Sequence, residues 1–187
     1  MTEDLQRVLD DITANEASAR AVIDGLNQGQ LNWREELGKT WSILQCIEHL
    51  ALADGHYTGA MREALKRSFP PRTGPIRPSA LGGVFLKRLE PPVTQAVTAP
   101  KVIVPRADKT VAEVMAAFLA AHEQIRAVIR DGTALDLNAI KFRNPLLPIL
   151  RVRVGTGLLI MAAHERRHLW QANRVRQALA ASGQTTR

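Results

Sequence analysis

The chain has 187 residues, 45% of them apolar, and a formal net charge of +7. This length predicts a single domain, residues 1–187, and the apolar fraction excludes a disordered chain. No apolar run approaches the ~20 residues that cross a bilayer, and the acidic start of the sequence is unlike a signal peptide. The single cysteine, Cys46, excludes an internal disulfide and favours a cytoplasmic protein.

The positive charge raises nucleic acid as a partner. The basic residues are, however, spread over the proline-rich middle and the C-terminal part of the chain, and no known nucleic-acid-binding motif organises them. We therefore expect a solvated basic surface, with neither nucleic acid nor a membrane as partner.

Two long helices are predicted in the first part of the chain. Residues 3–27 carry apolar side chains at helical spacing. Residues 41–67 form the second helix, with Ser42 and Gln45 as a capping box at its start and Pro70 shortly after its end.

Two more helices are predicted in the second part. The third covers residues 110–130, with Thr110 and Glu113 as another capping box and Asp131-Gly132 as its stop. The fourth covers residues 156–181.

The connection between the second and third helices, residues 69–109, is long. Eight of the ten prolines lie between Pro70 and Pro105, so we expect a mostly irregular crossover with a short helix near 79–89. The pieces 101–105 and 151–154 are candidates for extended structure, without a clear partner. Such a long connection is often a lid or pocket wall. The sequence thus predicts an all-α fold, a four-helix bundle with a Pro-rich crossover.

His164 and His168 form the most informative pair in the sequence. Four residues apart on a helix, their imidazoles share one face, roughly 6 Å apart along the axis, and can bind a zinc, nickel, copper or iron ion. With Glu165 they also match the H-E-x-x-H pattern of zinc proteases, whose Glu is the general base. A protease needs a third ligand downstream, but no acid or histidine follows His168, which argues against that class.

Three histidines remain as further ligands. His49 lies among apolar residues of the second helix and is the best candidate. His56, about 10 Å further along the same helix, cannot easily share an ion with His49 and is interpreted as structural or pocket-lining. His122 lies beside Glu123 and Gln124, on an apparently hydrated side, and is interpreted as a surface residue, so that His122→Ala should leave metal content unchanged.

Four residues close to the candidate ligands have two interpretations each. Cys46 is interpreted as a small buried hydrophobe rather than a ligand. Glu48 and Glu165 flank ligands but point ~100° away from them; each is a candidate outer carboxylate or proton shuttle, or else a solvated charge. Gln171 either hydrogen-bonds to the ligand His168 or simply packs.

The stretches Lys39-Thr-Trp-Ser-Ile-Leu-Gln-Cys-Ile-Glu-His-Leu-Ala-Leu-Ala-Asp and His164-Glu-Arg-Arg-His-Leu-Trp-Gln together resemble the DinB/YfiT superfamily. Its members carry a Trp-Ser pair before the second helix, a His-Leu pair on it and a His-x-x-x-His motif on the fourth. The resemblance covers the whole chain, except that the Pro70–Pro105 connection matches no family pattern. It implies an often dimeric four-helix bundle with a divalent metal held by His49, His164 and His168.

Three histidine ligands leave an open position on the ion, which is typical of a catalytic site. Water in that position becomes a usable nucleophile near neutral pH, and relatives in the superfamily include thiol-dependent transferases and isomerases as well as hydrolases. We therefore expect a zinc- or nickel-dependent hydrolase, or a transferase that uses a low-molecular-weight thiol, acting on a small molecule as a cytoplasmic homodimer. A non-catalytic metal-binding or stress-response protein is the alternative. Arg166 and Arg167 either hold an anionic substrate or are solvated.

Overall fold

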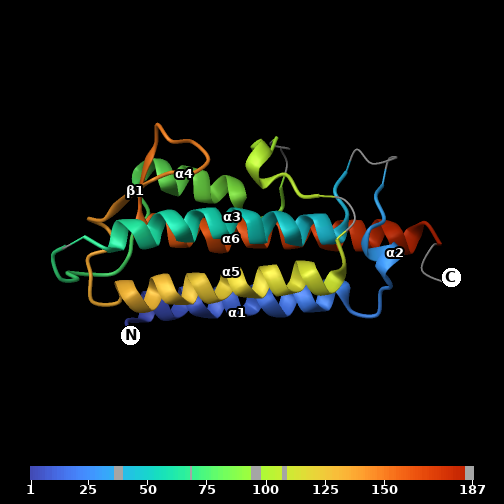
Figure 1. Cartoon of the computed structure of the whole chain (residues 1–187), viewed down its shortest axis with the longest axis horizontal. Helices are drawn as coiled ribbons and strands as arrows, with labels where there is room; N and C mark the ends of the chain where they lie inside the picture. The colour runs from blue at the N-terminus through green and yellow to red at the C-terminus, as the bar shows by residue number, and fades with distance from the viewer. Residues whose placement is uncertain (36–39, 68, 94–97, 107–108, 184–187) are drawn as a thin grey trace.

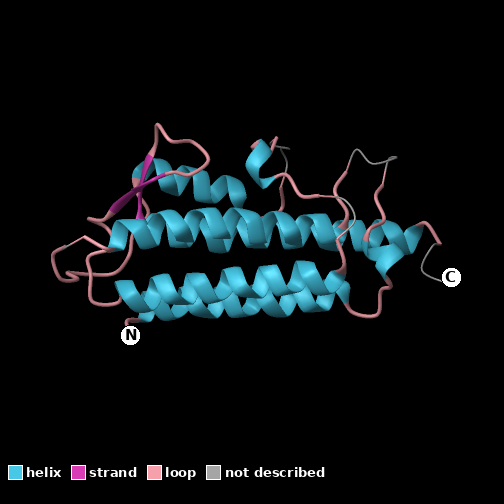
Figure 2. Cartoon of the chain, viewed as in Figure 1, coloured by secondary structure: helices cyan, strands magenta, loops and turns pink. Residues whose placement is uncertain are grey.

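The computed structural model describes residues 1–35, 40–67, 69–93, 98–106 and 109–183. Over these ranges the protein is mostly helical, as the sequence predicts (Figure 2). The four long helices, which lie side by side in Figure 1, are α1 (Glu3–Ile23), α3 (Ile43–Leu65), α5 (Val111–Gly132) and α6 (Val154–Ala181). Helix α3 contacts both α5 and α6, and α1 contacts α6. In the described part, no helix is both long and apolar enough to cross a bilayer.

The helix starts follow the local sequence. The backbone N–H of Gln45 donates to Ser42 Oγ at 3.1 Å, and the Gln45 side chain accepts from the Ser42 N–H, so the expected capping box is present. The Thr110–Glu113 box is present too. The first helix ends earlier than expected, and a separate short helix, α2 (Gln28–Leu31), follows it.

The connection between α3 and α5 contains helix α4 (Ala80–Leu89), which begins after Ser79 as expected and packs on α6. The expected extended piece at 101–105 is wrong in part: Lys101–Ile103 forms a single 3-10 turn, η2, whose Ile103 side chain is buried. The extended piece near 151 is confirmed as strand β2 (Arg151–Arg153). It pairs antiparallel with β1 (Lys141–Arg143), a partner that we did not identify in the sequence.

Asp4 fastens the connection between α3 and α5 to the first turn of α1. Its Oδ2 accepts a hydrogen bond from the Ile76 N–H at 2.7 Å and pairs with the Arg72 guanidinium. Desolvation alone would raise the pKa of Asp4, but the hydrogen bonds from Ile76, Thr2 and Arg72 outweigh it and lower the pKa to about 2. The carboxylate therefore stays charged and holds this connection at any ordinary pH.

Two apolar clusters fill the space between the helices. One lies towards the α1 N-terminus and includes Leu5 and Ile129. The other lies towards the α1 C-terminus and includes Val22 and Phe118. Burial of these side chains is what holds the helices together, since each contributes about 1.5–3 kcal/mol.

A layer of buried polar side chains lies between the two apolar clusters along the helices. Each of the four long helices contributes one residue: Asn15, Asp54, His122 and Glu165. Polar groups inside a core are costly unless they are paired, so the four side chains of this layer require partners within the protein.

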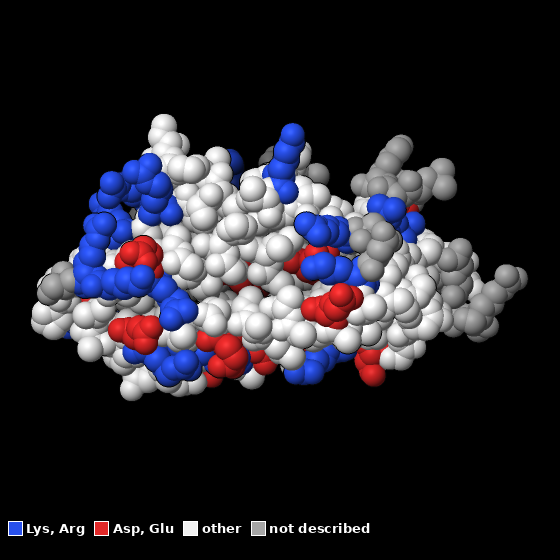
Figure 3. All heavy atoms as spheres, in the orientation of Figure 1, with Lys and Arg blue, Asp and Glu red and all other residues white. Residues whose placement is uncertain are grey.

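Basic and acidic side chains are intermingled on the face drawn in Figure 3. Basic groups gather towards its left end, and acidic groups lie directly beside them.

Candidate metal centre

The three histidines predicted as ligands lie together. His164 and His168 project from one face of α6 towards His49 on α3, because a separation of four residues brings side chains to the same side of a helix. One nitrogen from each ring lies within 4.8 Å of the others, and the Nε2 atoms of His49 and His164 are 3.3 Å apart.

Hydrogen bonds orient two of the three rings. His49 Nδ1–H donates to the carbonyl oxygen of Ile103, in η2 of the connection between α3 and α5, at 2.7 Å. His168 Nδ1–H donates to Gln171 Oε1 at 2.9 Å, which decides the role of Gln171 in favour of hydrogen bonding. With Nδ1 as the donor, the Nε2 atom of each ring keeps its lone pair, as a metal ligand requires.

All three imidazoles have lowered pKa values. Desolvation, reinforced by His49, lowers the pKa of His168 to about 3, and desolvation lowers that of His49. For His164, desolvation and the neighbouring His168 and His49 hold the pKa well below its ordinary value. The rings are therefore uncharged at neutral pH, which is the form that binds a metal.

The indole of Trp41 lies beside two of the three rings, and the rings differ in their exposure to solvent. The indole of Trp41 lies with its centroid 4.7 Å from that of His49 and 5.7 Å from that of His168. His49 and His168 are buried, whereas His164 is half-buried. Of the three rings, that of His164 is therefore the most exposed to solvent. This donor set suits a divalent transition metal, since three neutral imidazole nitrogens converge.

Glu48, next to His49, is not a solvated charge: its side chain is 3% exposed. Its Oε2 accepts a hydrogen bond from the backbone N–H of Arg106 at 2.9 Å, and its Oε1 pairs with Lys109 Nζ at 2.9 Å. Glu48 thus fastens the end of the connection between α3 and α5 to α3, and Arg106 lies three positions after Ile103, whose carbonyl orients His49.

Glu165 is not a solvated charge either, because it is 0% exposed. Its carboxylate faces away from the three histidines: Oε2 accepts from Asn15 Nδ2 at 2.7 Å, and Oε1 lies 3.1 Å from His122 Nε2. Burial raises the pKa of Glu165 to about 8. In this position it cannot serve a metal held by His164 and His168 as a protease general base, so the structure agrees with rejecting that class.

The interpretation of His122 as a surface residue is wrong. Its side chain is fully buried, packs at a tilt against Phe118 with ring centroids 4.1 Å apart, and contacts Glu16 and Glu165. The sequence signal was present, since Phe118 and Ile125 lie four residues before and three after it, on the same helix face. The adjacent polar residues Glu123 and Gln124 led to the opposite interpretation.

The remaining candidates are placed as follows. Cys46 is buried, as expected, and burial raises the pKa of its thiol. His56 is exposed and joins neither cluster. Arg166 forms ion pairs with Glu90 and Asp11. Lys39, the first residue of the motif around Trp41, lies outside the described residues.

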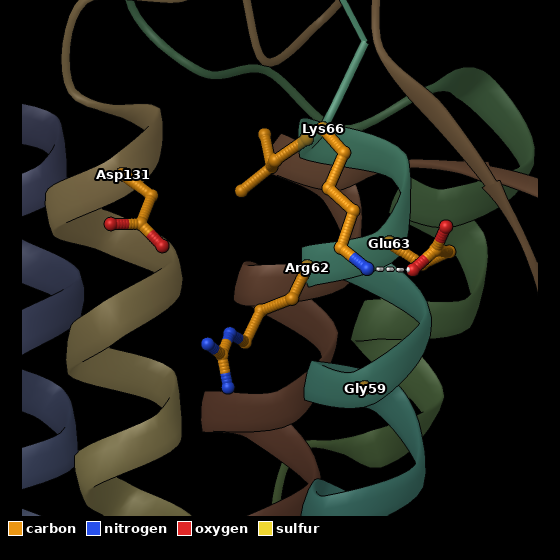
Figure 4. A pocket seen from close by; sticks show the side chains of 6 residues that line it. Gly59, Arg62, Glu63, Lys66 and Asp131 are labelled. Atoms are coloured by element: carbon orange, nitrogen blue, oxygen red, sulfur yellow. Dashed lines mark hydrogen bonds and ion pairs between the residues drawn. The ribbon is translucent and has the colours of Figure 1, made fainter.

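A shallow hollow of about 450 Å³ lies at the other end of α3, between that helix and α5 (Figure 4). Figure 4 shows Arg62 and Asp131 on its two sides and the exposed ion pair Lys66–Glu63 at its rim. Arg62 is engaged with Gln124 at 2.7 Å. None of the described metal-binding groups lines this hollow, so the histidine cluster remains the functional candidate.

Comparison with known proteins gives one match. The family model described as the DinB superfamily matches residues 11–172, which include the whole histidine cluster. No curated protein and no solved structure matches the chain significantly.

Proposed function

Because the chain belongs to the DinB superfamily, we propose that it is a metal-dependent enzyme in which His49, His164 and His168 hold one divalent transition-metal ion, zinc or nickel. We propose further that its four long helices form the four-helix bundle of that superfamily, as a single domain, with residues 69–109 as the crossover.

One observation carries the proposal: three uncharged imidazoles from two helices converge, with the Nδ1 atoms of two of them engaged elsewhere. In a core without an ion, three neutral histidines packed edge to face gain little that apolar side chains would not give. Hydrogen bonds that fix the tautomer of ligand histidines are typical of metal sites. When bound, such an ion supplies a Lewis acid that activates water or a thiol at neutral pH.

Two reactions fit this site, hydrolysis and the transfer of a low-molecular-weight thiol to a small molecule. Arg167 supports an anionic reactant such as a thiolate, since its charge is close enough to lower the pKa of both His164 and His168. Arg167 also donates a hydrogen bond to the carbonyl oxygen of Arg88 at 3.1 Å, and Arg166 forms ion pairs with Glu90 and Asp11. Trp41 shields the buried side of the cluster from water, and the half-buried His164 marks the side from which substrate approaches.

Elemental analysis of the purified chain, grown and dialysed with zinc, tests the metal site. His49→Ala, His164→Ala and His168→Ala should each lose one equivalent of zinc per chain, because two ligands hold an ion poorly. His56→Ala removes an exposed histidine from the same helix as His49 and is the matched control. Full zinc retention in His49→Ala would show that the three-histidine assignment is wrong.

A second assay separates the reaction classes. The zinc- and nickel-loaded protein is offered an electrophile with a low-molecular-weight thiol, or a set of esters and amides alone. Turnover that is lost in His164→Ala and weakened in Arg167→Gln, through a raised KM for the thiol, supports transfer. Metal binding without turnover in either arm favours the alternative, a non-catalytic metal-binding or stress-response protein.

We also propose a cytoplasmic homodimer. Exposed apolar side chains on α4, Leu81, Val84 and Phe85, offer a surface for packing a second copy. A monomer by light scattering at tens of micromolar would refute the dimer.

A further inference from the structure

The polar layer in the core contains a second group of side chains with metal-binding chemistry. Asp54 of α3, His122 of α5 and Glu165 of α6 are all buried and each offers one atom within 4.8 Å of the others. They share no residue with the three-histidine cluster. Asp54 lies five residues after His49, ~7.5 Å further along the helix, and Glu165 projects from the other side of α6.

The three groups point unpaired atoms at one another. Asp54 Oδ2, His122 Nε2 and Glu165 Oε1 are buried side-chain atoms that lack a hydrogen-bond partner. His122 Nε2 and Glu165 Oε1 are 3.1 Å apart, but their orientation is not that of a hydrogen bond. Leaving such groups unpaired inside a protein is destabilising, so three in one place indicate that something satisfies them together.

Glu16 fixes the state of the His122 ring. Its Oε1 accepts a hydrogen bond from His122 Nδ1–H at 3.0 Å and also pairs with Arg126 Nη2 at 2.8 Å. Since the Nδ1 proton is committed to this carboxylate, Nε2 turns its lone pair towards Asp54 and Glu165. A carboxylate behind a histidine whose other nitrogen faces a metal is a recurring arrangement in metal sites.

Asn15 fixes the carboxylate of Glu165 in the same way. Its Nδ2 donates to Glu165 Oε2 at 2.7 Å and to the carbonyl oxygen of Ala162 at 3.3 Å. This leaves Glu165 Oε1 directed into the cluster. The first helix, α1, therefore supplies the supporting groups, while the other three long helices supply the candidate ligands.

We propose that Asp54, His122 and Glu165 form a second, buried site for a divalent transition-metal ion, distinct from the three-histidine site. One imidazole nitrogen and two carboxylate oxygens suit zinc, manganese or iron(II). The two negative charges balance the ion, so the site is neutral inside the core. Ligand atoms bound at ~2.1 Å lie at most ~4.2 Å apart, and a small adjustment of the side chains reaches that from the observed separation. Its role is structural, since it would tie three helices together at the gap between the apolar clusters.

Zinc content of the full chain tests this site. The wild-type protein should hold two equivalents of zinc, and His49→Ala/His168→Ala, which disables the first site and leaves the second intact, should hold one. Adding Asp54→Asn, of nearly the same shape, should remove the remaining equivalent. In the double-histidine variant, zinc relative to a chelator should raise Tm by ~5–10 °C, and the added Asp54→Asn should abolish that rise.

The outcomes separate the two sites. In one outcome, the wild-type protein holds one equivalent of zinc, the double-histidine variant keeps it, and adding Asp54→Asn removes it. The buried site is then supported, and the proposed three-histidine function is refuted. If the double-histidine variant folds but holds no zinc, and its Tm is the same with zinc or chelator, the buried site is refuted and the cluster is a network of shared protons. If Asp54→Asn fails to fold, Glu165→Gln takes its place. The zinc content and Tm of the double-histidine variant test the buried site whichever of the two substitutions is used.

Discussion

Glu48→Ala is expected to weaken the attachment of the crossover to α3 and, through it, the histidine cluster. The Glu48 carboxylate accepts from the Arg106 N–H and pairs with Lys109 Nζ, both at 2.9 Å. Arg106 lies only three positions after Ile103, whose carbonyl oxygen accepts a hydrogen bond from His49 Nδ1–H. Without the carboxylate, the end of the crossover and the ring it orients lose their common anchor.

The structure sets the size of the effect. A hydrogen bond to a charged group contributes about 1.5–3 kcal/mol, and the ion pair with Lys109, whose side chain is 35% exposed, contributes no more than ~1 kcal/mol. We expect Glu48→Ala to lower the free energy of unfolding by ~2–4 kcal/mol and Tm by ~5–12 °C in a chain of this length. Zinc affinity should fall by up to ~10-fold, as for other supporting residues of metal sites.

Urea unfolding followed by circular dichroism, with a chelator present, measures the loss of stability separately from any loss of metal. Lys109→Ala removes only the exposed ion pair and should cost less than ~1 kcal/mol. Glu48→Gln keeps an acceptor for the Arg106 N–H. Its loss of stability should lie between those of Glu48→Ala and Lys109→Ala. If the free energies of unfolding of Glu48→Ala and Lys109→Ala differ by less than ~0.5 kcal/mol, the Arg106 hydrogen bond does not anchor the crossover.

Three more predictions concern stability. The lowered pKa of Asp4, about 2 against 3.8 when unfolded, contributes ~2 kcal/mol that is fully present above pH ~4 and is lost as the pH falls to ~2. Asp4→Asn should therefore unfold more easily at pH 7 and lack this part of the acid transition; identical acid unfolding of the two proteins would contradict it. Ser42→Ala removes the cap of α3 and should cost ~1 kcal/mol by urea unfolding, whereas an unchanged midpoint would show that the cap is dispensable. Gly157→Ala would place a methyl group against Met61 and Phe142 and should lower stability by ~1–3 kcal/mol; a Tm equal to that of the wild type would mean that the core yields there.

Much of this protein could be predicted from short stretches of sequence. Helix starts depend on residues three apart, which is why the boxes at Ser42 and Thr110 were predicted correctly. The pairing of His164 with His168 follows from the helical repeat alone, since residues four apart share a face. His49 was identified from its apolar surroundings and from the motif that resembles the superfamily.

The tertiary structure decided which side of each helix is covered, and by what. Glu165 and His122 have polar neighbours in sequence, so their local pattern favours exposure, yet both are buried because Asn15, Glu16 and Asp54 from other helices surround them. A strand's partner and the Ile103 carbonyl that orients His49 likewise come from distant parts of the chain. Helical periodicity specifies which residues share a face of one helix, but burial and pairing depend on the neighbour that covers that face, and that information is not local.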